Sequence, residues 1–234
     1  MDEKILGSPF SNQDDCKSFS SLIKAGILVD NFPNTPPVFA SPLAKRYYFN
    51  WLFPKRSLNP PSSLPALIKN AISTMSASLL KNSTLPGDFP KEATFQHLFM
   101  EGLALHTPPL CAICSELSKV FPLDTNIDKP QTVPGEIDFY LNGALRWGIE
   151  LLVNGPNIGE RLNRFEIPHG QYAALGVCDY AIVDLRKMSS ADEPTNIARR
   201  HPKRVTVSFL ADDFKVVEVF FGEDAVPEKI TLAD

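Results

Sequence analysis

The stretch GEIDFYLNGALRWGIELLVNG, residues 135–155, constrains the fold more than any other part of the chain. Two arms of alternating apolar character flank the dipeptide Asn142-Gly143, which suits the tight turn of a β-hairpin. Each arm carries one carboxylate where a buried strand favours an aliphatic side chain, Asp138 in the first arm and Glu150 in the second. The stretch therefore predicts two paired strands with an acid inside each.

The two acids predict a cation. Pairing about a two-residue turn sets position 138 opposite about position 147, so strand twist or a bulge has to bring Asp138 and Glu150 together. Two carboxylates at one end of a buried sheet cannot both stay ionised without a counter-charge. Carboxylate oxygens are the ligands that Mg²⁺ prefers, so we expect Mg²⁺ or Mn²⁺ to bind Asp138 and Glu150.

A second interpretation needs no metal. Glu136 and Asp138 would face solvent on an edge strand, and Glu150 would pair with Arg146 or Arg164. Glu150, however, lies inside WGIELLV, whose other members favour burial. An unpaired acid is costly in the interior of a buried strand, which keeps the metal interpretation open.

The rest of the chain predicts an α/β fold in which helices flank a mixed central sheet. The apolar run at 178–186 is typical of a central strand, and 204–222 alternates like a second hairpin. The segment 110–122 fits a strand or a helix equally well. Helical patterns occupy residues 63–83, 90–105 and 157–167.

The prolines divide the chain. There are 21, bunched where regular elements would be interrupted. Helix, strand, strand and helix signals follow one another in residues 1–58, which predicts a small winged-helix-like module. We expect residues 59–88 to form a helical connector and residues 89–234 to form the main α/β domain.

Composition limits the partners. The net charge is -4, so a nucleic-acid site has to rest on a local basic patch. The densest basic run, RRHPKR, supplies candidate phosphate contacts, although a solvated loop is an equal alternative. These candidate nucleic-acid contacts are Arg199, Arg200, Lys203 and Arg204.

Membrane, disulfide and zinc chemistry are not indicated. No apolar run approaches the roughly 20 residues that span a bilayer. The acidic first residues have no apolar signal segment, so we expect a nuclear or cytoplasmic protein. Cys111 and Cys114 have no second ligand pair at zinc spacing, so we interpret them as ordinary buried thiols.

Several phrases of the sequence resemble a known family. A helix with a glutamate, a strand with an aspartate, and a strand with a glutamate, followed by a helix and a strand, is the layout of the PD-(D/E)XK nuclease superfamily. More closely, PKEATFQHLF, GEIDFYLNGALRWGIELLVNG, LNRF and DYAIVDLR resemble the restriction-endonuclease-like domain of Crinkler effectors and their transposon-linked relatives. VFASPLAKRYYFNWLFP and ALIKNAISTMSASLL resemble the end of the P-loop ATPase module that precedes this domain. The resemblance covers residues of about 35–190.

This resemblance implies a set of catalytic residues. Glu92, on the first helix, would join Asp138 and Glu150 as an Mg²⁺ or Mn²⁺ ligand. The position two after Glu150 is normally lysine, and here it is Leu152. In these relatives a Gly-Lys-Tyr segment often supplies the lysine instead, but this chain has Gln171 at that place, which carries no charge.

Cations near the acids would have to replace the lysine. Arg161 and Arg164 follow the acids on the predicted helix and can stabilise phosphate charge, although an arginine is not a plausible base. Gln96 lies one turn beyond Glu92 on the same helix face, so it would orient Glu92 or a phosphate. His97 is expected on the helix surface.

Two functions follow from the resemblance. The first is a metal-dependent nuclease that hydrolyses phosphodiester bonds in DNA, as a Crinkler-like effector domain of the host-cell nucleus. The alternative is a catalytically degenerate nuclease fold that binds DNA or a host protein. The three acids favour the nuclease, and Leu152 and Gln171 favour the degenerate fold.

Overall fold

The computed structural model divides the chain into two compact units, residues 1–54 and 55–234. In the first unit only β1 (Leu28–Val29) and β2 (Val38–Phe39) are described, and they pair antiparallel. The winged-helix-like module expected at residues 1–58 otherwise lies almost wholly outside the described residues. In the second unit the structure describes residues 56–85, 87–122, 132–155, 157–166, 170–188, 201–224 and 226–234.

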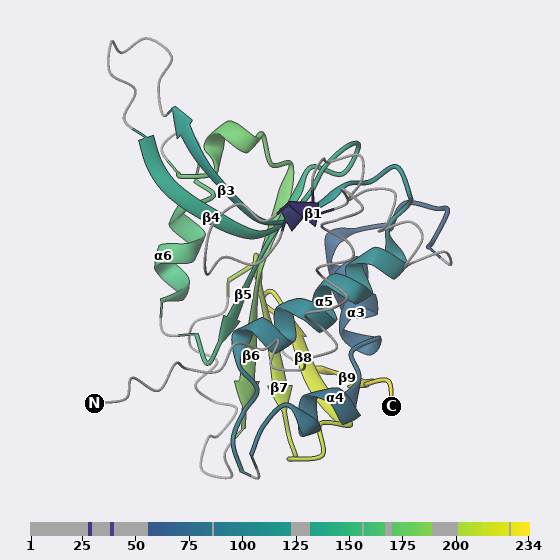
Figure 1. The fold of residues 1–234 in the computed structure, drawn as a ribbon. Helices are drawn as coiled ribbons and strands as arrows, with labels where there is room; N and C mark the ends of the chain where they lie inside the picture. Colours follow the sequence, from purple (N-terminus) through teal and green to yellow (C-terminus); the bar gives the residue numbers. More distant parts are fainter. Residues whose placement is uncertain are drawn as a thin grey trace, which may run out of the picture. The chain divides into compact units, whose positions relative to one another are not determined.

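A mixed seven-stranded sheet forms the centre of the second unit (Figure 1). The strands lie in chain order from β3 to β9, with β5, β6 and β7 parallel and the other neighbours antiparallel. The predicted α/β class is confirmed, and the ambiguous segment 110–122 contains a strand. The strands are β3 (Ile113–Pro122), β4 (Thr132–Leu141), β5 (Trp147–Val153), β6 (Asp179–Lys187), β7 (Arg204–Phe209), β8 (Val216–Phe221) and β9 (Glu228–Thr231).

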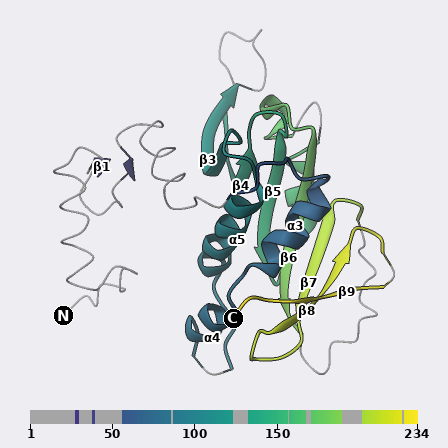
Figure 2. The ribbon, with the colours of Figure 1, turned by 90° about the vertical axis from the view of Figure 1, so that its right-hand side faces the viewer.

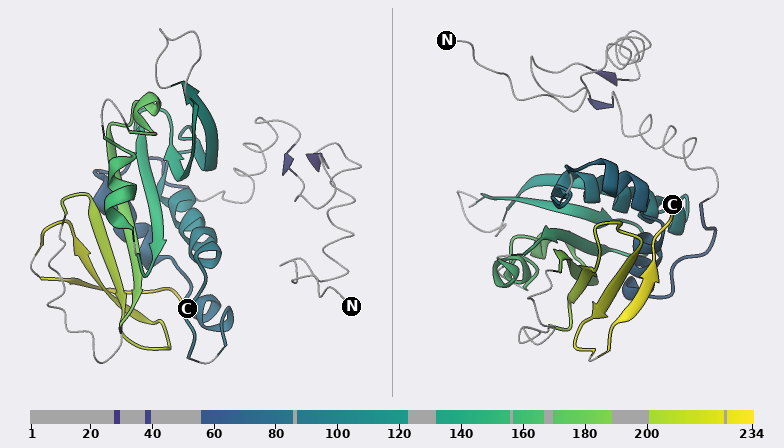
Figure 3. Two further views of the ribbon diagram at one scale, coloured as in Figure 1. Left: turned by 90° about the vertical axis from the view of Figure 1, so that its left-hand side faces the viewer. Right: turned by 90° about the horizontal axis from the view of Figure 1, so that it is seen from below.

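Helices cover both faces of this sheet (Figure 3). The longer helices α3 and α5 pack side by side on one face (Figure 2), and α6 lies on the other. The helical stripe at 63–83 is two helices, because the first ends at Ser73 with Thr74 as its C-cap, and Ser76 caps a new helix by accepting a hydrogen bond from Leu79 N–H. The helices are α3 (Leu64–Ser73), α4 (Ala77–Asn82), α5 (Glu92–His106) and α6 (Ile158–Asn163), with a 3₁₀ turn at Ala173–Leu175.

The packing of α3 on α5 fixes the helix that carries the candidate acid Glu92. A Cβ atom at Gly102 of α5 would lie 2.6 Å from the carbonyl oxygen of Ala71 in α3, so only glycine permits this crossing. At the C-terminal end of α5 the buried guanidinium of Arg56 donates to the carbonyl oxygens of Ala104, at 3.0 Å, and Thr107, at 3.1 Å. These bonds satisfy carbonyl groups that a helix end leaves without partners.

The hairpin of β4 and β5 differs from the expected register. Leu141 pairs with Trp147, so residues 142–146 connect the strands in place of a two-residue turn. The predicted pairing of position 138 with position 147 is therefore wrong. Arg146 in this connection has φ 47°, a conformation that no local pattern of the sequence indicates. Continuing the register one step past the Phe139–Ile149 pair places position 138 opposite position 150.

Candidate active site where β4 and β5 separate

Asp138 lies where the backbone pairing of β4 and β5 stops. The last backbone pair is Phe139 with Ile149. Beyond it, the Asp138 carboxylate replaces the main chain as acceptor, since its Oδ2 receives the Leu151 N–H at 2.7 Å. Its Oδ1 receives a hydrogen bond from Gln96 Nε2 of α5 at 2.9 Å. The side chain is thus held between the helix and the sheet.

The surroundings of Asp138 are short of positive charge. Burial raises the pKa of Asp138 to about 7, against the opposing hydrogen bond from Leu151. The negative charges of Glu150 and Glu92 raise it further, and Arg161 lowers it. The structure therefore brings the other two sequence-predicted acids, Glu92 and Glu150, within electrostatic reach of Asp138. Gln96 links two of them, because its Nε2 also lies 3.5 Å from Glu92 Oε1.

Glu150 has no exposed surface and is held by hydrogen bonds and ion pairs. Arg161 Nη1 of α6 lies 2.6 Å from Glu150 Oε2, and Arg164 Nη1 lies 3.6 Å from Oε1. The Tyr172 hydroxyl also bonds to Oε1. Burial raises the pKa of Glu150, and the Tyr172 hydrogen bond and the two arginines oppose that rise.

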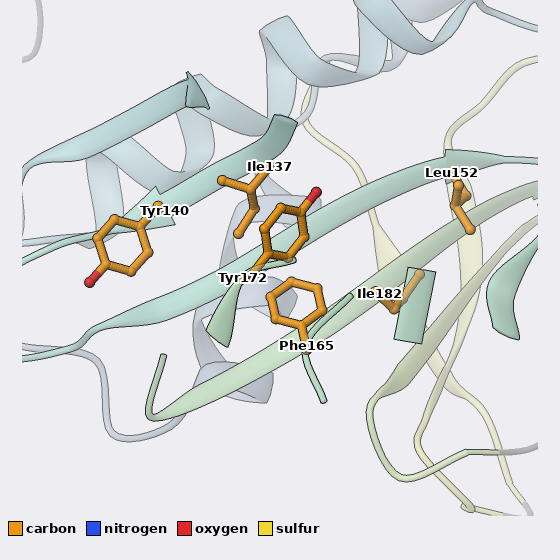
Figure 4. Close-up of a cluster of buried hydrophobic side chains, with 6 residues drawn as sticks. All are labelled: Ile137, Tyr140, Leu152, Phe165, Tyr172 and Ile182. Carbon is orange, nitrogen blue, oxygen red and sulfur yellow. The ribbon is translucent and has the colours of Figure 1, made fainter. Parts of the chain in front are cut away.

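Tyr172 is the site residue that the sequence did not indicate. Its hydroxyl lies between the Glu150 carboxylate and the Glu136 carbonyl oxygen, 2.6 Å from the latter, so one phenolic proton faces two acceptors. Its ring packs edge-on against Phe165 in the buried cluster of Figure 4. The neighbouring Gln171, which we expected in the site, has a buried Oε1 that accepts no hydrogen bond within the described part of the chain.

Leu152, at the position where the family has lysine, lies in the same apolar cluster. Its side chain is 5% exposed and shares the cluster with Phe165 and Ile182 (Figure 4). An ammonium group at this position would have to be buried among apolar groups. The leucine is therefore a packing residue in this structure.

The metal-free interpretation is correct in one respect and wrong in another. Glu150 does pair with Arg164, as that interpretation expected, although Arg161 lies closer. Asp138, however, is only 9% exposed, and β4 lies between β3 and β5, so it is not an edge strand. Glu136 alone of the two acids on β4 is exposed.

Of the four candidate basic contacts, two have carboxylate partners. Lys203 Nζ lies 2.5 Å from Asp179, and the buried Arg204 lies 2.7 Å from Asp184. Arg204 thus neutralises a fully buried acid, which favours a structural role. The other two candidates, Arg199 and Arg200, lie outside the described residues. His97 is exposed on α5, as expected.

Asp184 forms a second buried acidic centre that the sequence analysis did not single out. Its Oδ2 lies 2.6 Å from Arg186 Nε and 2.7 Å from Arg204 Nη2, while Gly155 N–H donates to Oδ1 at 3.0 Å. Two cations and a backbone donor compensate this carboxylate. It therefore differs from Asp138, whose hydrogen-bond donors are both neutral.

The donor types at Asp138 suit a hard divalent ion. Carboxylate oxygens of Asp138, Glu150 and Glu92 match the preference of Mg²⁺, and the excess negative charge around Asp138 favours a cation. In the conformation of the described residues, no three His, Cys, Asp or Glu side chains converge on one point. Glu150 Oε2 is paired with Arg161 Nη1 at 2.6 Å.

Comparisons with protein-family models, with curated proteins and with solved structures find no match to this chain. Among the described residues, every helix is too short or too polar to span a bilayer.

Proposed function

We propose that the unit of residues 55–234 is a restriction-endonuclease-like nuclease that hydrolyses phosphodiester bonds in DNA with Mg²⁺ or Mn²⁺. The observation that carries the proposal is Asp138, a buried acid held by two neutral donors and flanked by Glu92 and Glu150. Such a group gains from a bound cation, whereas a structural acid is compensated by cations of the protein itself, as Asp184 is.

The order of the elements supports the proposal. α5, β3, β4, β5, α6 and β6 follow one another along the chain, and β3 to β6 are neighbours in one sheet. This succession agrees with the helix, strand and helix layout of the superfamily that the sequence resembles. The acids lie on its first helix, second strand and third strand.

In the proposed nuclease, some site residues would position the acids and others would contact the phosphate. Gln96 and the Leu151 N–H fix the Asp138 carboxylate, and Tyr172 fixes that of Glu150. Arg161 and Arg164 are cations next to Glu150 that can donate hydrogen bonds to a phosphate oxygen. A bound ion would polarise the phosphodiester and lower the pKa of the attacking water.

A degenerate nuclease fold that binds DNA or a host protein is the second candidate. Two observations favour it: Leu152 is buried in an apolar cluster, and Glu150 is already paired with Arg161. A fold of this kind would keep the arginines for phosphate contacts and would lack a group that activates water.

Plasmid nicking separates the two candidates. The nuclease should nick supercoiled DNA with Mg²⁺ or Mn²⁺ and not with EDTA. Asp138→Asn should lower the rate by at least about 100-fold, since it removes a charged ligand, whereas the exposed acid variant Asp212→Asn should leave the rate unchanged. Gln171→Lys should raise the nicking rate if the missing positive charge of a lysine is the only defect at that position.

One result would reject catalysis. If wild type and Asp138→Asn are equally inactive and both shift DNA in a gel, the binding module is the better description. The gel shift should then weaken in Arg164→Gln, because phosphate contacts would carry the affinity.

A further inference from the structure

Arg161 occupies the side of Glu150 that a metal ion would need. We infer that Arg161, by pairing with Glu150, blocks metal binding to Glu150 until nucleic acid binds. A phosphate group of the nucleic acid then pairs with Arg161, and the metal ion binds Glu150. This inference rests on the proposed function, and it adds regulation of the site: nucleic acid and metal would bind cooperatively.

The contacts of Glu150 identify the partner that can leave. The Tyr172 ring is 1% exposed and fixed in the apolar cluster, so its hydroxyl is held in place at Oε1. Arg161 reaches Oε2 from outside, with 26% of its side chain exposed. It belongs to α6, a short helix that has no fully buried residue. Moving Arg161 therefore disturbs less packing than moving Tyr172.

Arg164 is less suited to this exchange. It lies 3.6 Å from Glu150 Oε1, a distance beyond a good hydrogen bond, and it pairs with Glu160 at 3.1 Å. It also lies within 3.5 Å of the Tyr172 hydroxyl. If Arg164 moved away from Glu150, it would keep Glu160 as a carboxylate partner. Arg161 has Glu150 as its ion-pair partner within the described residues, so a phosphate could replace that partner.

The charges explain why a phosphate should take part. Arg161 and Arg164 balance Glu150 and Glu160 in the ligand-free protein. A divalent ion on Glu150 would leave the Arg161 guanidinium beside two added positive charges, and this repulsion opposes metal binding. A phosphodiester carries the missing negative charge and accepts hydrogen bonds from arginine in the same geometry as a carboxylate. Each ligand should therefore raise the affinity for the other.

The first test measures metal binding without any catalytic readout. Mn²⁺ is titrated into wild type, Arg161→Gln and the control Lys69→Gln, and free Mn²⁺ is followed by its electron paramagnetic resonance signal. The control removes one positive charge from an exposed ion pair with Glu228. Arg161→Gln should bind Mn²⁺ about tenfold more tightly, a coupling of ordinary size, and Lys69→Gln should match wild type.

The second test measures the coupling itself, and its first comparison is made on wild type alone. A saturating short DNA duplex, with a blank titration of DNA alone, should tighten Mn²⁺ binding to wild type by about tenfold. The same duplex should tighten binding to Lys69→Gln equally and to Arg161→Gln hardly at all. Thermal melting followed by circular dichroism checks that both variants are folded.

The outcomes separate this inference from the proposed function. If Asp138→Asn abolishes Mn²⁺ binding while neither Arg161→Gln nor DNA strengthens it, the metal site stands and the Arg161 exchange is refuted. If no protein binds Mn²⁺ with or without DNA, both are refuted. Tighter binding in Arg161→Gln together with DNA coupling in wild type supports both.

Discussion

Asp138→Asn should stabilise the protein at neutral and alkaline pH in the absence of divalent ions. The pKa of Asp138 rises from its ordinary 3.8 to about 7, first through burial and then through Glu150 and Glu92. The unfolded chain therefore releases this proton near pH 4, and the folded protein keeps it until near pH 7. The contribution of Asp138 to the free energy of unfolding is full below pH 4 and is lost as the pH rises to 7.

The structure gives the size of the effect. A rise of about three in pKa corresponds to about 4 kcal/mol, and the carboxyl is 9% exposed, so solvent screens it little. Asparagine stays neutral and can still accept the Leu151 N–H. The variant should therefore exceed wild type in stability by up to about 4 kcal/mol at pH 8 and match it near pH 4.

Urea denaturation from pH 4 to pH 8 in EDTA measures this difference. Asp212→Asn is the control, because that side chain is 68% exposed and its ion pair with Lys187 should contribute at most about 1 kcal/mol. Added Mg²⁺ should stabilise wild type and leave Asp138→Asn unchanged. A difference that does not vary with pH, or a variant less stable than wild type at pH 8, would refute the reasoning.

Two further changes test the fold around the site. Gly102→Ala should destabilise the protein by about 1–3 kcal/mol in urea denaturation, since its Cβ would meet the Ala71 backbone, whereas Gly159→Ala, whose Cβ meets nothing within 4 Å, should be neutral or stabilising. Leu152→Lys should lower the melting temperature and leave nicking activity no higher, because the side chain is buried against the Phe165 cluster; a stable variant with increased nicking would contradict this.

The sequence determined the elements whose signals are local. The helical stripe near 90–105 became α5, and the apolar run at 178–186 became β6, because side-chain periodicity is set by helix and strand geometry itself. The burial of Glu150 also followed from its apolar neighbours. The order of β4, β5 and β6 in one sheet agrees with the expected strands.

Only the tertiary structure decided how these elements meet. The register of β4 on β5 follows from a connection of residues 142–146, in which Arg146 has a positive φ, and this register places Asp138 at the level of Glu150. The segment 110–122 contains a strand because β4 pairs with it from Ile113–Leu141 to Pro122–Thr132, and this pairing compensates its weak strand propensity.

The hydrogen-bond partners of the acids also could not be predicted from the sequence. Tyr172 reaches Glu150 from a segment with no periodic pattern, and Gln96 bonds to Asp138 across the space between helix and sheet. Such contacts join residues far apart in the chain, so they exist only after the layers have packed. The pKa of a carboxyl group depends on those neighbours and on its burial. The sequence therefore identified Asp138 as a candidate site residue, but its raised pKa follows only from the tertiary structure.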